Sequence, residues 1–131
     1  MRVMLDTNIL VSAVVFYNRE IHNMVSKIVA DHELILASYV IDELIDVIGR
    51  KFPEQLDKVT EFLAELSYTH VDTPKYITPG LFDIRDAFDY PIVYSAIVFD
   101  VDVLITGDKD IHAVEIEKPK VMTIAEFASV Y

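Results

Sequence analysis

A chain of 131 residues with 53% hydrophobic content is long enough for one domain with a substantial core. The absence of cysteine excludes disulfides, thiolate metal ligands and cysteine nucleophiles. The formal net charge of -11 argues against a protein that binds nucleic acid by positive charge alone, unless divalent cations mask some of the acids. We expect a single domain over residues 1–131, soluble and cytoplasmic, because no apolar run is long enough to cross a membrane and Asp6 comes too early for a signal peptide.

The first quarter of the chain predicts a strand followed by two helices. Residues 3–5 form a short apolar run that stops at Asp6, which predicts a buried strand with a carboxylate at its carboxyl end. That end of an open α/β sheet is where ligands bind. Residues 9–16 are nearly all apolar and predict a buried helix, and the spacing of apolar residues over 21–29 predicts an amphipathic one.

The next segment repeats the arrangement of strand and helix. Residues 34–37 predict the second strand, and Ser38 is the expected N-cap of a helix that begins near Tyr39 and ends at Gly49. Glu43 lies one turn into this helix. It should therefore lie near the same sheet edge as the acid that follows the first strand.

The middle of the chain predicts one more helix, a short strand and a loop. Residues 54–67 have the spacing of an amphipathic helix, and residues 70–71 form a short third strand. Residues 72–90 contain prolines, a glycine and several acids, which predicts a loop. Asp89 and Pro91 then open a largely buried helix, where the acid is either a helix cap or part of a site.

The last part of the chain predicts a strand that ends as the first one does. Residues 103–106 are apolar up to the threonine and lead to Asp108. A short final strand near Val121 precedes a closing helix, for which Thr123 and Glu126 form a capping box. The repeated acid after an apolar strand is difficult to explain as surface chemistry. The order of the elements predicts an α/β domain.

Four carboxylates from separate elements are therefore expected at one sheet edge: Asp6, Glu43, Asp89 and Asp108. At 4 Å each pair repels by roughly 1 to 4 kcal/mol, so a positive charge must offset them. A set of oxygen ligands without cysteine or paired histidines suits Mg²⁺ or Mn²⁺ rather than zinc. Such an ion polarises phosphoryl oxygens and activates water for in-line attack.

Four motifs, in this order along the chain, resemble the PIN domain. They are Asp6-Thr7-Asn8, Glu43 with residues 44–52, Asp89 before Pro91-Ile92-Val93, and Thr106-Gly107-Asp108-Lys109-Asp110. The resemblance covers essentially the whole chain and is greatest to the toxin-type PIN nucleases of prokaryotic toxin–antitoxin pairs, including VapC-like ribonucleases. The chain departs from the family at residues 98–102, which are bulky and acidic where small residues are usual.

The resemblance implies a three-layer α/β/α sandwich with a central parallel sheet of about five strands. It implies a Mg²⁺- or Mn²⁺-dependent endoribonuclease that hydrolyses phosphodiester bonds of single-stranded RNA, commonly as a homodimer. It also implies the toxin component of a toxin–antitoxin pair, whose small antitoxin brings positive charge to the acidic cleft. An RNA-processing PIN nuclease without antitoxin and a non-catalytic PIN-like domain that binds RNA or protein remain alternatives.

The resemblance also assigns residues by position. The catalytic and metal-binding acids would be Asp6, Glu43, Asp89 and Asp108, with Asp110 as a further metal ligand. Asn8 and Thr106 would hydrogen-bond the ligand carboxylates or the scissile phosphate, and Asp86 is a reserve ligand, a loop acid or a cap. The candidates for phosphate contacts, or else plain surface cations, are Arg19, Arg50, Lys51, Arg85 and Lys109. Of these, the Arg50-Lys51 pair and Lys109 are favoured.

Other phosphate-handling classes do not fit the sequence. Three glycines in the chain are too few for a dinucleotide-binding fingerprint or a P-loop. An aspartyl-phosphate phosphatase needs a second aspartate two residues after the first, where this chain has Asn8. A receiver domain needs an acid pair after its first strand, and only Asp6 is present there.

Overall fold

Five parallel strands form the centre of the protein in the computed structural model, which describes residues 1–131. The strands are β1 (Arg2–Leu5), β2 (Glu33–Ala37), β3 (Thr69–Val71), β4 (Val103–Ile105) and β5 (Lys120–Met122). Their order in the sheet is β3-β2-β1-β4-β5, and every neighbouring pair is parallel. The carboxyl ends of all five strands therefore lie along one edge. The strand order reverses between β1 and β4, which is where open α/β sheets bind ligands.

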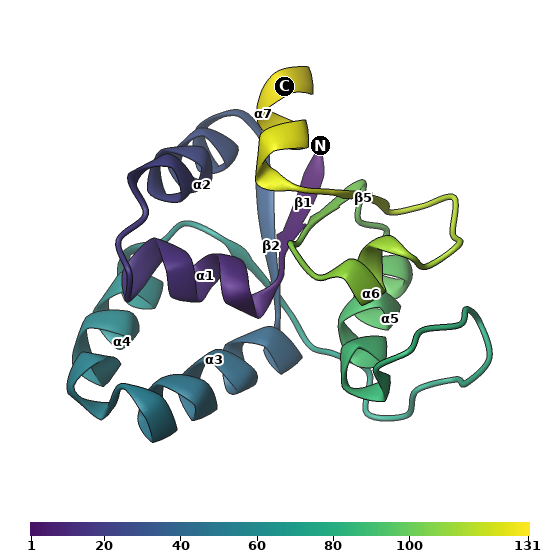
Figure 1. Ribbon diagram of the computed structural model, residues 1–131, viewed down its shortest axis with the longest axis horizontal. Coiled ribbons are helices and arrows are strands. Elements are labelled where there is room, and N and C mark those ends of the chain that lie inside the picture. Colours follow the sequence, from purple (N-terminus) through teal and green to yellow (C-terminus); the bar gives the residue numbers. More distant parts are fainter.

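Helices cover both faces of the sheet, so the predicted three-layer α/β fold with a five-stranded parallel sheet is confirmed. The helices are α1 (Thr7–Val14), α2 (Arg19–Asp31), α3 (Ser38–Lys51), α4 (Leu56–Glu65), α5 (Tyr90–Val98), α6 (Lys109–His112) and α7 (Ile124–Val130). Two 3₁₀ turns, η1 (Pro53–Gln55) and η2 (Ala87–Asp89), precede α4 and α5. Figure 1 shows α1, α2, α3 and α4 on one side of the sheet and α5 and α6 on the other. None of the helices has both the length and the apolar character needed to span a membrane.

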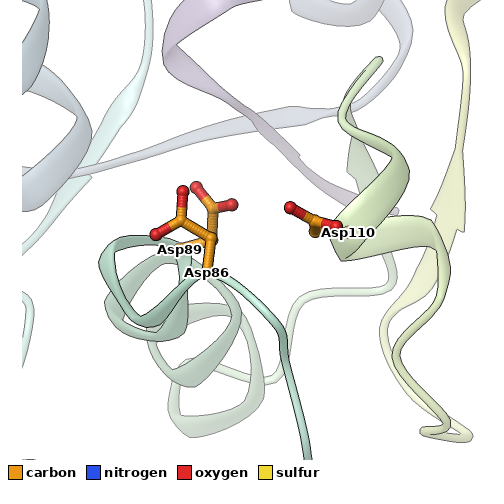
Figure 2. Close-up of side chains that lie close together, drawn as sticks. All are labelled: Asp86, Asp89 and Asp110. Atoms are coloured by element: carbon orange, nitrogen blue, oxygen red, sulfur yellow. The ribbon is translucent and has the colours of Figure 1, made fainter.

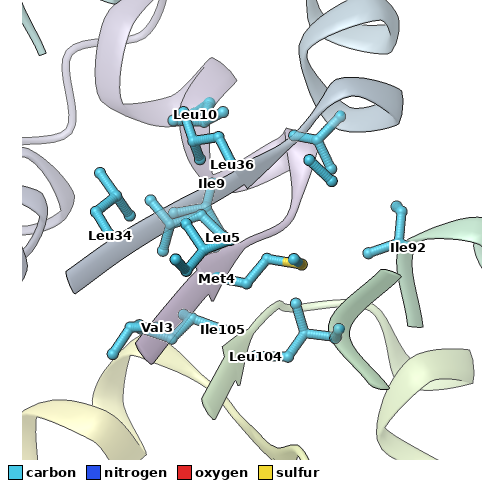
Figure 3. Packing of buried hydrophobic residues seen from close by; sticks show 14 of the residues in the cluster. Val3, Met4, Leu5, Ile9, Leu10, Leu34, Leu36, Ile92, Leu104 and Ile105 are labelled. Carbon is cyan, nitrogen blue, oxygen red and sulfur yellow. The ribbon is translucent and has the colours of Figure 1, made fainter. Parts of the chain in front are cut away.

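A single cluster of 33 buried hydrophobic side chains forms the core on both faces of the sheet. Val3, Met4 and Leu5 of β1 have no exposed surface, and Figure 3 shows them between side chains of the neighbouring strands. Strands covered on both faces need apolar residues throughout, which is why the strand sequences are continuous apolar runs. The carboxylates at the ends of these strands are therefore attached to the buried centre of the molecule.

The register between β1 and β4 fixes which residues meet at the carboxyl edge. Leu5 is paired with Ile105, so the next residues on the two strands, Asp6 and Thr106, come out of the sheet together. The backbone N–H of Asp6 donates to the carbonyl of Ile105 at 3.1 Å and extends the pairing by one position. The two strand ends therefore form one rigid platform.

Helix α3 differs from its predicted form at both ends. It begins at Ser38, not Tyr39, and the Ser38 hydroxyl does not cap it but accepts the backbone N–H of Thr73 at 2.9 Å. The predicted end at Gly49 is wrong, because one glycine costs only about 1 kcal/mol within a helix. The helix continues to Lys51 and ends before Phe52, since a residue that precedes proline disfavours helical backbone.

Other boundaries shift less. The fourth helix is shorter than the predicted 54–67, because Pro53 starts the 3₁₀ turn η1 and the regular helix occupies only Leu56–Glu65. The capping box of the last helix is confirmed, with Thr123 and Glu126 each accepting the other's backbone N–H at 3.1 Å. The predicted loop is confirmed for residues 72–86, which form no helix or strand.

The bulky, acidic residues at 98–102 fit into the turn between α5 and β4. Val101 is fully buried, while the Asp102 carboxylate accepts the backbone N–H of Arg2 at 2.8 Å and pairs with Lys118 at 3.2 Å. Both acids of this stretch therefore have partners, since Lys118 also pairs with Asp100 at 2.8 Å. These contacts lie at the amino end of β4, away from the edge that carries the candidate site.

Candidate active site

Asp6 is the central carboxylate of the carboxyl edge, and only 4% of it is exposed. As N-cap of α1, it accepts the backbone N–H of Thr7 on Oδ1 at 2.7 Å. Its Oδ2 accepts the hydroxyl of Thr106, also at 2.7 Å. Burial raises the pKa of Asp6, while these two hydrogen bonds act in the opposite direction. Each oxygen still has a lone pair free to bind a cation.

Thr106 joins the acids that follow β1 and β4. Its fully buried side chain donates to Asp6 and accepts the backbone N–H of Asp108 at 3.0 Å. Asp108 in turn accepts the backbone N–H of Asp110 on Oδ1 at 2.8 Å and so caps α6. The Thr106 carbonyl accepts a hydrogen bond from Nε2 of His112 at 2.7 Å. These contacts hold the two carboxylates in fixed orientations without a positive charge between them.

A second group of carboxylates faces this platform. Oxygens of Asp86, Asp89 and Asp110 all lie within 4.8 Å of one another. Figure 2 shows Asp86 and Asp89 side by side at the start of α5, with Asp110 opposite them on α6. Asp86 accepts the backbone N–H of Phe88 at 3.0 Å and is therefore a cap of the turn η2 as well as a member of the cluster. Two segments far apart in sequence thus contribute to one site.

Asp89 does not cap α5, contrary to one of the two roles expected for it. It occupies the N-cap position, but its backbone is already helical and its side chain makes no capping hydrogen bond. Its Oδ2 is buried and has no hydrogen-bond partner. Burial raises the pKa of Asp89 to about 7, with further contributions from Asp108, Asp86 and Asp6. Asp89 therefore lies near both groups of acids, and its carboxylate has no positively charged partner to offset the cost of burial and repulsion.

Glu43 lies half-buried in the second turn of α3, and its side chain makes no hydrogen bond. Its charge contributes to the raised pKa values of Asp6 and Tyr39, which places it at the same edge. The lower part of Figure 1 shows the starts of α1, α3 and α5 converging there. The structure therefore brings the four acids to one edge, together with Asp86, the expected reserve ligand, and Asp110.

Tyr39 is a residue of this edge that sequence reasoning missed. Its hydroxyl donates to the carbonyl of Phe88 at 2.6 Å and so ties α3 to the turn that carries Asp86 and Asp89. Burial raises the pKa of Tyr39, and the neighbouring carboxylates raise it further. The sequence position of Tyr39 could have indicated its place at this edge, because Tyr39 comes two residues after the carboxyl end of β2, as Thr7 does after β1.

Comparison with known proteins identifies the family. The PIN domain family model matches residues 2–110. The chain belongs to the PIN domain family. No curated protein matches its sequence.

Several solved structures share the PIN fold of this chain. VapBC2 from Rickettsia felis, bound to a DNA fragment from its promoter, has a TM-score of 0.74 at 20% identity over 94% of this chain and 98% of that one. DNA-bound VapBC from Salmonella typhimurium has a TM-score of 0.70 at 16% identity, over 95% and 98% of the two chains. VapBC-1 from nontypeable Haemophilus influenzae has a TM-score of 0.66 at 22% identity, over 95% and 99%. At these identities the likeness concerns the fold.

The carboxylates of this PIN domain fit a hard divalent cation. The ligand atoms available are carboxylate oxygens from separate rigid elements, which is the donor type that Mg²⁺ and Mn²⁺ prefer. The partnerless Asp89 Oδ2 is an independent indication, since a buried polar atom is rarely left unsatisfied. The acidic cluster is thus consistent with the metal site of a PIN nuclease.

The predicted phosphate contacts are distributed unevenly around the site. Arg50 pairs with Asp46 at 3.0 Å, and it lies seven residues beyond Glu43, about 10 Å along the axis of α3. Lys51 follows it, so this pair is at the far end of the helix. Lys109 is exposed and makes no ion pair.

Asn8 and Arg85 differ in how they contact the acids of the site. Asn8 is exposed in the first turn of α1, and its side chain makes no hydrogen bond to a carboxylate. Arg85 is the cation that contacts the cluster: its Nε and Nη2 donate to the two oxygens of Asp110 at 2.9 and 2.7 Å. No other ion pair of the structure involves an acid of the site. The remaining carboxylates therefore lack a cationic partner.

Proposed function

We propose that this PIN domain is an endoribonuclease that hydrolyses phosphodiester bonds of single-stranded RNA and depends on Mg²⁺ or Mn²⁺. The observation that carries the proposal is the convergence of carboxylates on Asp89, whose buried Oδ2 has no partner. A protein without a bound cation gains nothing from this arrangement, since each neighbouring carboxylate raises the pKa of Asp89. Membership of the PIN family supports the same chemistry.

The proposal gives the residues distinct roles. Asp6, Glu43, Asp89 and Asp108 would hold the metal, and Asp86 joins them through its place in the cluster. When bound, the ion supplies charge stabilisation at the phosphoryl oxygens and an activated water. Thr106 orients Asp6 and Asp108 through its two hydrogen bonds. Asn8, which is exposed at the start of α1, would donate to the RNA phosphate. Asp110 lies in the same cluster, but both of its oxygens accept hydrogen bonds from Arg85.

We further propose that the protein is a cytoplasmic homodimer and the toxin of a toxin–antitoxin pair. The structural neighbours are VapBC complexes, which supports an antitoxin as partner. The net charge of -11 favours a partner segment that is positively charged. Expression of the wild-type protein in bacteria should then slow growth, whereas Asp89→Asn should not. Normal growth with an enzyme that is active in vitro would instead favour an RNA-processing role without antitoxin.

The nuclease activity is tested with single-stranded RNA and DNA of mixed sequence in Mg²⁺, Mn²⁺ or EDTA. Cleavage of RNA should require the metal and should be lost in Asp6→Asn and Asp89→Asn. Asp72→Asn is the matched control, because Asp72 is an exposed acid of the same irregular segment and lies outside the cluster, and it should cleave as the wild type does. Absence of cleavage, together with calorimetry that detects no divalent-ion binding, would contradict the proposal and leave a non-catalytic PIN-like domain.

A further inference from the structure

The ion pair between Arg85 and Asp110 has an unusual place in the molecule. It joins the irregular segment before η2 to the first turn of α6, 25 residues further along the chain. Two parallel hydrogen bonds of 2.9 and 2.7 Å make it bidentate, which fixes the plane of the guanidinium. The pair therefore holds an otherwise exposed guanidinium in one orientation beside the acidic cluster.

Arg85 keeps N–H donors that the ion pair does not use. A guanidinium has five N–H donors, and Asp110 uses two of them. The Arg85 side chain is 81% exposed, so its remaining donors are accessible to a ligand, while the Asp110 side chain is 21% exposed. Both oxygens of Asp110 already accept a strong hydrogen bond. The pair as a whole therefore offers donors to an anion.

The free donors lie next to the acidic cluster. An oxygen of Asp110 is within 4.8 Å of oxygens of Asp86 and Asp89, and Figure 2 shows Asp110 facing both across the site. The charges of Asp86 and Asp108 contribute to the raised pKa of Arg85, which also places the guanidinium at this edge. A hollow of about 330 Å³ adjoins the pair, and it is lined by Asp83, Ile84, Arg85, Asp110 and Ala113.

The other basic residues do not offer the same arrangement. Arg50 is paired with Asp46 and lies two turns of α3 beyond Glu43. Lys109 is exposed and has no carboxylate to orient it. An ammonium group would in any case bind a phosphate as a point charge, whereas a guanidinium binds two of its oxygens at once.

We propose that Arg85 binds a phosphate of the RNA beside the metal site, and that Asp110 positions Arg85 instead of coordinating the metal. The proposal rests on the proposed function, because the substrate is the RNA of that reaction. An aspartate that holds the guanidinium in place lowers the cost of ordering a long, exposed side chain when the phosphate arrives. It also keeps the arginine from pairing with Asp86 or Asp89, which are needed for the cation.

The test compares Arg85→Ala, Arg85→Lys and Asp110→Asn in steady-state cleavage of RNA and in calorimetric titration with Mn²⁺. Arg85→Ala should raise KM about tenfold, as expected for loss of a charge-assisted bidentate contact, and Arg85→Lys should recover only part of the loss. Asp110→Asn should raise KM in the same direction. Neither Arg85→Ala nor Asp110→Asn should lower the affinity for Mn²⁺ by more than about twofold. The KM of the double variant should be no higher than that of Arg85→Ala, because both substitutions remove the same contact.

Lys118→Ala is the matched control, since it also removes an exposed cation that is paired with aspartates, but at the opposite sheet edge. Its KM should stay within about twofold of the wild type. An unchanged KM in Arg85→Ala would overturn the proposal while leaving the nuclease intact. Loss of Mn²⁺ affinity in Asp110→Asn as large as in Asp89→Asn would overturn it too, by showing that Asp110 is a ligand. A folded wild-type protein that cleaves no RNA in Mn²⁺ would instead contradict the proposed function itself, and this proposal with it.

Discussion

At the scale of single residues, the site is defined by carboxylates whose charge the protein alone does not balance. Asp6 and Asp89 both have raised pKa values, chiefly because they are buried, and neighbouring acids add to the effect. Asp110 shows the opposite, since the hydrogen bonds from Arg85 lower its pKa. Asp6 and Asp89 thus have no cationic partner within the protein, whereas Asp110 is paired with Arg85.

Asp89→Asn should therefore stabilise the metal-free protein at high pH. An acid whose pKa is about 7 in the folded state and 3.8 in the unfolded state holds its proton more tightly when folded, so the free energy of unfolding falls as pH rises between these values. One unit of pKa shift corresponds to about 1.4 kcal/mol, and partial exposure reduces the total, so we expect a gain of about 1 kcal/mol at pH 8. Urea denaturation in EDTA at pH 5 and pH 8 measures it. Asp72→Asn should show no such gain, and a lower stability of Asp89→Asn at pH 8 would contradict this expectation.

Thr106→Val should have the opposite effect on stability. The change removes the hydroxyl that donates to Asp6 and accepts from the Asp108 backbone, both within the buried platform. Loss of buried hydrogen bonds that leaves their partners unsatisfied costs about 1 to 3 kcal/mol. Urea denaturation should detect this loss, and RNA cleavage should fall with it, because Asp6 loses its orientation. Thr106→Ser retains the hydroxyl and should restore both; a serine variant as impaired as valine would show that packing of the methyl group is what matters.

At the scale of elements, the sequence predicts the strands and the capping box of α7 but not the contacts between distant segments. The strands at 3–5 and 103–105 could be read from apolar runs because parallel strands are buried on both faces. The role of Ser38 could not, because its hydroxyl serves Thr73, 35 residues away, instead of its own helix. The pairing of Arg85 with Asp110 and the bond from Tyr39 to Phe88 depend in the same way on how the elements pack.

The bond from Tyr39 to the turn η2 predicts that a change in α3 affects the proposed metal site. Tyr39→Phe removes the hydroxyl that holds the Phe88 carbonyl, and with it one restraint on the turn between Asp86 and Asp89. The affinity for Mn²⁺ should fall several-fold in calorimetry, while the free energy of unfolding falls by only about 1 kcal/mol. Tyr76→Phe, at a side chain that is 86% exposed, should change neither quantity. Unaltered Mn²⁺ affinity in Tyr39→Phe would mean that the turn is held by its other contacts.

At the scale of the whole molecule, the net charge is -11 and several of the acids gather at one sheet edge. Divalent cations should therefore stabilise the fold, apart from their role in the proposed catalysis. An ion that binds only the folded state adds about 2.7 kcal/mol at one hundred times its dissociation constant. Thermal denaturation should show Tm rising with Mg²⁺ or Mn²⁺ and returning to its starting value in EDTA. Sodium chloride at equal ionic strength separates general screening from site binding, because screening acts on all surface charges alike. If Asp89→Asn gains as much Tm from Mn²⁺ as the wild type does, the stabilising ions bind elsewhere on the acidic surface. If the gain disappears in Asp89→Asn and persists in Asp72→Asn, the carboxyl edge is where the ion binds.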